Sequence, residues 1–412
     1  MKHTGWNSNM RTFVIAGAMA LSACQTSDHT SSSVGVEQQA LGALPALNKQ
    51  YVVLLKPGEY RDNVAATIAE INRLKAVHGI PSEKVMYIYD AFGGFAIKDA
   101  STELAAALAS EASVVSVAVN ALVHGDSPVP PPGPPPPPAT GQVTPAGVTR
   151  VNGGTTTSSA TLWVIDSGVD LANPDLNVST SKSISFVQSN DACGEATSPT
   201  SADDFEGHGT RMAGLAAAID NTIGVVGVAP GSQVVSVRAL NQNACGTFAA
   251  VIAAANHVRK NAAPNDVVNM SVWGTSLGGA LVGGHANTAV AWAAVSAGVY
   301  ISICAGNAAD DAKLYSPGSA NGVRVYTIAA STASDGFATL YSNWGVPPID
   351  YIAPGYAMEG LVNDSSGSAT IGGYGTSNSA AIISGMLLIQ HSFATSALIA
   401  DTHGNTYTLP SL

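Results

Sequence analysis

Residues 372–377 read Gly-Gly-Tyr-Gly-Thr-Ser and lead into the small, apolar run Ala380 to Leu388. The glycines allow a tight turn, and the apolar run predicts a buried helix that has Ser377 in its first turn. Serine is a favoured N-cap, so Ser377 is consistent with a capping role as well as with a catalytic one. The rest of the chain decides between the two.

A serine hydroxyl becomes a good nucleophile only when a base takes its proton and a third group orients that base. The apolar run Thr161 to Ile165 ends in Asp166, which places a carboxylate at the end of a buried strand. The segment Asp204 to Thr210 leads into a helical pattern, so His208 lies where a loop enters a helix. The order Asp, His, Ser is one of the three chain orders of the serine triad.

The chain resembles the subtilisin-like serine peptidases, especially the proteinase K branch, from Thr144 to about Gln390. Further ordered matches are Gly227-Val228-Ala229-Pro230, Val268-Asn269-Met270-Ser271, Ala305-Gly306-Asn307, Tyr315-Ser316-Pro317-Gly318-Ser319, Tyr341-Ser342-Asn343-Trp344-Gly345 and Ala353-Pro354-Gly355. The resemblance implies a serine endopeptidase in which Asp166 orients His208 and His208 is the base for Ser377.

The resemblance also implies an oxyanion hole formed by the Ser377 backbone N–H and the Asn307 side-chain amide. A turn residue is the alternative interpretation of Asn307. The residues implied to line the substrate cleft are Ser271, Val272, Trp273, Gly274, Ala305 and Gly306. Several positions depart from the family and leave specificity open: Trp273 for a glycine, Arg211 for a histidine, and Asn378, Ser379 and Ala381 for Met, Ala and Pro.

Apolar strand patterns alternate with helical patterns after residue 144, which predicts an α/β fold with a parallel sheet covered by helices on both faces. Strands are expected at 162–165, 234–240, 267–271, 299–304 and 325–330, and helices at 210–219, 248–259, 285–297 and 377–390. Residues 48–124 follow a βαββαβ order, typical of a ferredoxin-like α+β domain. This domain is similar to the inhibitory propeptide of the family, with an unrelated small domain as the alternative.

The segments outside the two domains differ from them in amino-acid composition. Residues 1–23 are interpreted as a lipoprotein-type signal peptide, with Cys24 as the lipidated residue and 24–47 as a polar tether. An ordinary signal peptide is the alternative. Residues 125–143 form a proline-rich linker, most simply a stiff spacer and alternatively a ligand for a proline-binding module. Residues 144–412 form the catalytic domain.

The chain has 412 residues, of which 46% are apolar, so it can bury a sizeable core. Its formal net charge of −11 argues against nucleic acid as a partner. Among the cysteines, Cys193 and Cys245 resemble a disulfide found in part of the family, with two free thiols as the alternative, and Cys304 is expected to be a buried thiol. Catalysis should need no cofactor or metal; Asp310, Asp311 and Asp335 are loose candidates for a structural calcium site.

We therefore expect an exported monomeric zymogen that acts on proteins or peptides and is inhibited by its own propeptide. The precursor would be held at the bacterial envelope by its lipid, and the mature enzyme would be extracellular. Two alternatives remain open. One is a catalytically silent binding protein with the same fold, and the other is a peptide ligase that passes the acyl group to an amine.

Overall fold

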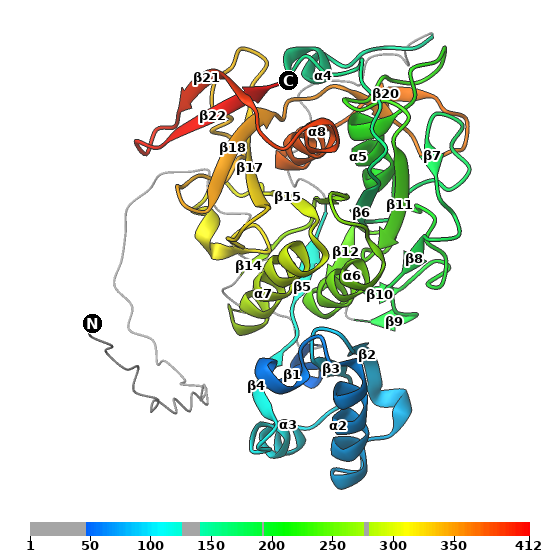
Figure 1. Cartoon of the computed structure of the whole chain (residues 1–412), viewed down its shortest axis with the longest axis vertical. Helices are drawn as coiled ribbons and strands as arrows, with labels where there is room; N and C mark the ends of the chain where they lie inside the picture. The colour runs from blue at the N-terminus through cyan, green and yellow to red at the C-terminus, as the bar shows by residue number, and fades with distance from the viewer. Residues whose placement is uncertain (1–46, 126–140, 192, 276–279) are drawn as a thin grey trace, which may run out of the picture. The chain divides into compact units, whose positions relative to one another are not determined.

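The computed structural model of the protein describes residues 47–125, 141–191, 193–275 and 280–412 (Figure 1). The signal peptide, nearly all of the tether, Cys24 and most of the proline-rich linker lie outside the described residues. None of the described helices is long and apolar enough to cross a membrane.

The N-terminal domain has the predicted ferredoxin-like order. Its elements are η1 (Leu47–Lys49), β1 (Tyr51–Leu55), α1 (Pro57–Tyr60), α2 (Val64–Val77), η2 (Ser82–Lys84), β2 (Val85–Tyr89), β3 (Gly94–Ile97), α3 (Thr102–Ala109) and β4 (Val114–Val119). The strands pair antiparallel in the order β2-β3-β1-β4. Val53, Ile71, Leu74, Phe95 and Leu108 lie in its core, so the helices cover one face of the sheet.

The large domain is built on one extended sheet. Its strands are β6 (Leu162–Asp166), β7 (Asn177–Val178), β8 (Ile184–Ser185), β11 (Gln233–Arg238), β13 (Val267–Met270), β15 (Tyr300–Cys304), β17 (Val325–Ser331), β18 (Ile349–Pro354), β21 (Ala394–Ala400) and β22 (Thr406–Ser411). They follow the order β21-β22-β18-β17-β15-β13-β6-β11-β7, and β8 also pairs with β11. The six strands from β18 to β11 are parallel, which confirms the predicted fold class.

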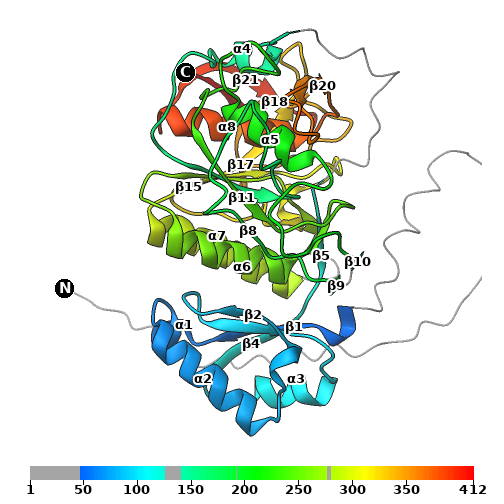
Figure 2. The same cartoon turned by 90° about the vertical axis from the view of Figure 1, so that its right-hand side faces the viewer.

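Helices cover both faces of this sheet (Figure 2). On one side lie α5 (His208–Ala217) and α8 (Thr376–Ile389), and on the other lie α6 (Phe248–Asn261) and α7 (Ala280–Ala297); the short α4 (Ala146–Arg150) precedes the sheet. Because both faces are covered, the central strands are buried along their whole length, which explains their nearly continuous apolar sequence.

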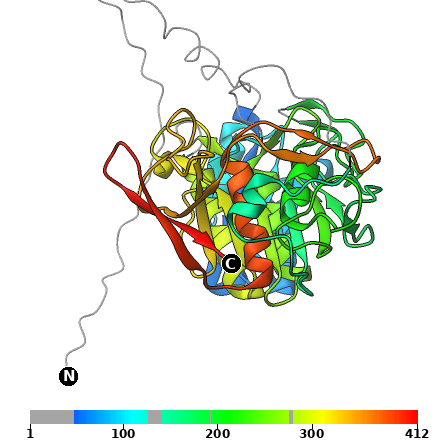
Figure 3. The same ribbon diagram turned by 90° about the horizontal axis from the view of Figure 1, so that it is seen from above.

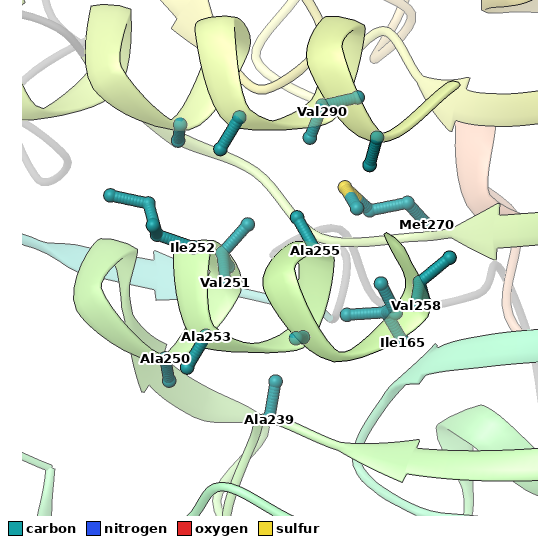
Figure 4. Close-up of a cluster of buried hydrophobic side chains, with 14 of the residues drawn as sticks. Ile165, Ala239, Ala250, Val251, Ile252, Ala253, Ala255, Val258, Met270 and Val290 are labelled. Carbon is teal, nitrogen blue, oxygen red and sulfur yellow. The ribbon is translucent and has the colours of Figure 1, made fainter. Parts of the chain in front are cut away.

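The core between α6, α7 and the sheet shows why these helices form (Figure 4). Thr247 caps α6 by accepting the Ala250 N–H, which satisfies one of the free donors of the first turn. The α6 side chains Val251 and Val258 are completely or almost completely buried, as is Met270 of the sheet. Burial stabilises each such side chain by about 1.5–3 kcal/mol, so packing rather than intrinsic propensity holds α6 in place.

Short strands form two-stranded sheets outside the two main sheets. They are β5 (Leu122–His124), β9 (Asn190–Asp191), β10 (Gly194–Glu195), β12 (Cys245–Thr247), β14 (Gly274–Thr275), β16 (Tyr315–Ser316), β19 (Glu359–Leu361) and β20 (Ala369–Ile371), with the 3-10 helix η3 (Ala312–Leu314). A disulfide joins Cys193 to Cys245, the first residue of β12, and Cys304 is a buried free cysteine, both as predicted.

The C-terminal hairpin of β21 and β22 has no counterpart in the sequence-based prediction. It extends the sheet at the β18 edge and is visible in red in Figure 3. The Leu412 N–H donates to the Val151 carbonyl, so the last residue is fastened next to the end of α4. The hairpin is antiparallel, and it makes the sheet mixed rather than purely parallel.

Candidate active site

Four predicted polar residues lie at the ends of elements of the large domain. Asp166 is the last residue of β6, His208 is the first residue of α5, and Ser377 is the second residue of α8. Asn307 follows β15 by three residues. Because the carboxyl ends of parallel strands meet at one edge of a sheet, Asp166 and Asn307 share the edge at which ligand sites form in such folds.

The start of α5 is held close to the end of β6. Gly207 has a φ of 113°, and the Asp204 carboxylate accepts hydrogen bonds from the backbone N–H and the hydroxyl of Thr210. A Cβ atom on Gly209 would collide with the Gly168 carbonyl oxygen, so this position requires glycine. These contacts place the His208 side chain beside Asp166.

His208 and Asp166 form a hydrogen-bonded pair. Nδ1 of His208 donates to Oδ1 of Asp166 over 2.8 Å, and the same oxygen accepts the Ser167 N–H. The Asp166 carboxylate is fully buried. With its proton on Nδ1, the imidazole has Nε2 free to accept a proton.

The charges around His208 favour its protonated form. Burial alone would lower the pKa of the imidazole, but the Asp166 and Glu206 carboxylates outweigh burial and raise this pKa to about 9. Glu206 also accepts the backbone N–H of His208 over 2.6 Å. Burial raises the pKa of the Asp166 carboxyl above its ordinary value, and the facing His208 opposes that rise.

Arg211 stands in α5 where the family has a histidine, and it supports the turn before Ser377. A Cβ atom on Gly372 or Gly360 would collide with its side chain, so both glycines make room for Arg211. Arg211 thus connects α5 with the segment that leads into α8. The sequence reveals the substitution but not this role.

The Asn307 side chain has a fixed orientation and an unused donor. Its Oδ1 accepts the backbone N–H and the hydroxyl of Thr376, at 2.8 and 2.9 Å. Its Nδ2 is buried and has no hydrogen-bond partner among the described residues. A buried donor without a partner is rare and costs free energy, so this group is available for a ligand oxygen.

Strand β5 lies beside these groups, although the sequence pattern does not predict it. It pairs antiparallel with β12, and His124 exchanges two backbone hydrogen bonds with Trp273, of 2.7 and 2.8 Å. The next N–H, that of Gly125, donates to the Ala244 carbonyl over 3.0 Å. The end of the N-terminal domain is therefore an extended strand held on both sides.

Gly125 lies close to three of the candidate residues. Ser377 Oγ donates to the Gly125 carbonyl in a long hydrogen bond of 3.5 Å. A Cβ atom on Gly125 would lie 3.4 Å from Nδ1 of His208 and 3.6 Å from Oδ1 of Asp166. Ser377, His208 and Asp166 therefore all lie next to Gly125, the residue that follows β5.

The six residues expected to line the cleft divide into two groups. Trp273 and Gly274 contact β5 directly, since a Cβ atom on Gly274 would collide with the Leu122 carbonyl. Ser271, Val272, Ala305 and Gly306 are buried, and three of them have hydrogen bonds within the large domain. The Ser271 hydroxyl donates to the Ser377 carbonyl, the Gly306 N–H donates to the Thr376 hydroxyl, and the Ala305 carbonyl accepts from Asn343.

The three carboxylates considered for calcium each have protein contacts. Asp335 pairs with Arg150, Asp310 accepts the Tyr315 hydroxyl, and Asp311 caps η3. In the ranges that the structure describes, no three His, Cys, Asp or Glu side chains are grouped so that they could hold a metal ion. The calcium site stays a prediction.

Residues 157–397 match the family model described as the Subtilase family. The chain belongs to this family. Subtilisin-like protease 5 of Arthroderma otae is 35% identical to this subtilase over 202 residues, which are 48% of the chain and 46% of that protein. Subtilisin NAT of Bacillus subtilis subsp. natto is 31% identical over 264 residues, 62% of each protein. The matches thus span about half to three fifths of these relatives.

A solved structure supports the same fold for this subtilase. The crystal structure of a cold adapted subtilisin-like serine proteinase superposes with a TM-score of 0.50 and 26% sequence identity. The match covers 64% of this chain and 96% of that one. The family and the fold therefore agree with the resemblance found in the sequence.

Proposed function

We propose that this subtilase is a serine endopeptidase made as a self-processing zymogen. The proposal rests on the position of β5 and of Gly125, which follows it. This extended segment lies next to Ser377 and the His208–Asp166 pair, and the Asn307 amide has an unused donor. An extended peptide that adds a strand between two existing ones is a common mode of peptide recognition. The chain would thus present its own linker as the first substrate.

The geometry supports acyl transfer to Ser377. The Ser377 Oγ would bond to the carbonyl carbon of the scissile peptide while Nε2 of His208 takes the hydroxyl proton. The negative charge on the carbonyl oxygen would be stabilised by Asn307 Nδ2 and the Ser377 N–H, a first-turn donor without a helical partner. His208 would then give its proton to the leaving amine, and water would release the acyl group by the reverse sequence.

The N-terminal domain would act as the inhibitor. Asn256 of α6 accepts the N–H groups of Ala91 and Phe92, and the Asp90 carboxylate accepts from Asn256 and Lys260. Asn120 accepts the Ala249 N–H at the start of α6. These contacts would hold the domain on the enzyme after the bond is cut, so that its new C-terminus blocks the cleft.

The two rival functions are less well supported. A silent binding protein would have no need for the buried, unpartnered Asn307 amide or for the His208–Asp166 pair. A ligase would use the same acyl-enzyme, but the relative Subtilisin-like protease 5 is named as a protease. Hydrolysis is therefore the function that the site supports best.

The register of β5 predicts the processed bond. The Gly125 carbonyl accepts from Ser377 Oγ while Asn307 Nδ2 remains free, so the Gly125 carbonyl does not occupy the oxyanion position. The next carbonyl in the sequence belongs to Asp126. We expect self-cleavage between Asp126 and Ser127, so that N-terminal sequencing and intact mass of the mature protein give Ser127 as the first residue.

Two outcomes would contradict this prediction. A new N-terminus before Leu122 or after Thr144 would show that β5 is not the processed strand. As a matched variant, Gly125→Val should slow the cut, because the Cβ atom would lie only 2.6 Å from Leu240 Cδ1 and close to His208. Equal rates for Gly125→Val and the wild type would contradict the placement of Gly125.

Self-cleavage should accelerate with pH. His208 must be neutral to act as the base, and its pKa of about 9 keeps it largely protonated at neutral pH. The first-order rate of conversion should therefore rise steadily from about pH 6 to about pH 9. A rate that is already constant above about pH 6 would mean that His208 is not the titrating base.

The start of the chain suggests how the enzyme leaves the cell envelope. Lipidation of Cys24 would anchor the precursor, and more than one acyl chain is needed for stable anchoring. The cut after Asp126 separates this anchor from the large domain. Membrane fractionation of the wild type and of an inactive variant tests the release, since only the wild-type domain should become soluble.

A further inference from the structure

An aromatic wall lies beside β5, the strand that occupies the position proposed for a substrate. It consists of Trp273 and Tyr315, whose rings meet edge to face at 5.7 Å. The Trp273 indole also lies 6.3 Å from the His124 imidazole, centroid to centroid, with a tilt of 56° between the planes. Both distances fall in the range in which aromatic pairs attract one another. Trp273 occupies a position where a glycine is usual in the family.

The backbone fixes which substrate side chain meets this wall. His124 and Trp273 exchange both of their N–H···O bonds, so they are directly opposite residues of an antiparallel pair. Side chains at such positions project to the same face and contact each other. Any residue in the place of His124 would therefore face the indole, whatever the rest of the peptide sequence.

Contacts outside β5 also hold the wall in place. Tyr315 is buried, and its hydroxyl donates to the Asp310 carboxylate over 3.1 Å. The indole, which is half-buried, packs against this fixed ring. Side chains held by such contacts lose little further freedom when a ligand binds. A carboxylate packed against these rings would lose hydration, which disfavours an acidic side chain.

We propose that Trp273, supported by Tyr315, selects an aromatic or imidazole side chain at the third residue before the scissile bond. This inference rests on the proposed peptidase function and on cleavage after Asp126, which makes His124 that third residue. Peptides and unfolded segments with His, Phe, Tyr or Trp at this place form the preferred substrate class.

The test uses the processed enzyme and quenched fluorescent peptides copied from residues 121–128, with His, Phe, Ala or Asp in the place of His124. An aromatic pair contributes about 0.5–1.5 kcal/mol, so kcat/KM for His and Phe should exceed that for Ala by about 2- to 12-fold. The Asp peptide should be the poorest. Active enzyme is counted by titration of Ser377, and cleavage sites are confirmed by mass.

Two substitutions of Trp273 separate ring contact from bulk. Trp273→Phe keeps an aromatic ring and should keep the preference for His and Phe over Ala. Trp273→Leu keeps an apolar side chain without the ring. It should bring the ratio of kcat/KM for the His or Phe peptide to kcat/KM for the Ala peptide close to one. The ratio of two peptides on one enzyme is the readout, so a general loss of activity in either variant does not affect it.

The outcomes distinguish this inference from the function on which it rests. Cleavage of all peptides at similar kcat/KM by the wild type, or a preference that survives in Trp273→Leu, would overturn the role of Trp273 and leave the peptidase assignment intact. If the enzyme cleaved neither these peptides nor an unfolded protein substrate, the proposed function would instead be overturned.

Discussion

Ser377→Ala is expected to leave the protein at its full length and without peptidase activity. The substitution removes the atom that would bond to the substrate carbonyl, so neither the linker nor an added peptide can be cut. In subtilisin itself, loss of the nucleophile costs about a million-fold in kcat, and that enzyme sets the scale of loss expected here. Electrophoresis of the purified chain and a peptide assay measure both effects.

The fold should survive this change, because Ser377 loses only one atom and its backbone remains the start of α8. Circular dichroism of the variant and of the wild type serves as the control. The variant should also stay in the membrane fraction if Cys24 is lipidated. A variant that still converts itself at the wild-type rate would show that Ser377 is not the nucleophile.

Asn307→Ala should lower kcat by about 100- to 1,000-fold with little change in KM, the loss that follows removal of the corresponding donor in subtilisin. The Nδ2 group has no partner among the described residues, so its hydrogen bond would form only with the charged oxygen of the transition state. Steady-state kinetics of the processed enzyme on one peptide give both constants.

A matched variant separates this effect from loss of local structure. Thr376→Val removes one of the two hydrogen bonds that orient Asn307 but leaves Nδ2 in place and the Thr376 N–H as an anchor. It should cost much less activity than Asn307→Ala. If Asn307→Ala raised KM and left kcat unchanged, Asn307 would be a substrate-binding residue and not part of an oxyanion hole.

Much of the large domain could be predicted from the sequence because its strands are buried on both faces. A continuous apolar run that ends in Asp166, and another that leads to Asn307, identify parallel strands and the edge where their ends meet. The turn chemistry around Gly207 and Gly375 likewise places His208 and Ser377 at helix starts. The candidate site follows from these local signals.

Other features depend on tertiary contacts that a local pattern does not contain. Strand β5 has only three residues and forms because β12 and Trp273 pair with it on its two sides. In α2, Val64 falls on the same helical face as Ile71 but is 43% exposed. Thr67 of α2 is instead buried and donates its hydroxyl to the Tyr60 carbonyl. The C-terminal hairpin gives only a weak apolar pattern, because most of β21 is exposed.

The Trp273 substitution illustrates the same limit. The sequence shows a bulky residue in place of a glycine but not the direction of its ring. The structure places the indole against Tyr315 and beside His124. The ring therefore lies beside β5, and the backbone of Trp273 pairs with His124.

The most direct test of the account is the reaction of the processed enzyme with a fluorophosphonate, followed by peptide mapping. An activated serine attacks phosphorus and keeps the reagent, whereas an ordinary capping serine does not react. The account predicts one adduct per chain, on Ser377, and none in His208→Ala. An unlabelled wild-type protein, or an adduct on a different serine, would contradict the assignment of Ser377 as the nucleophile.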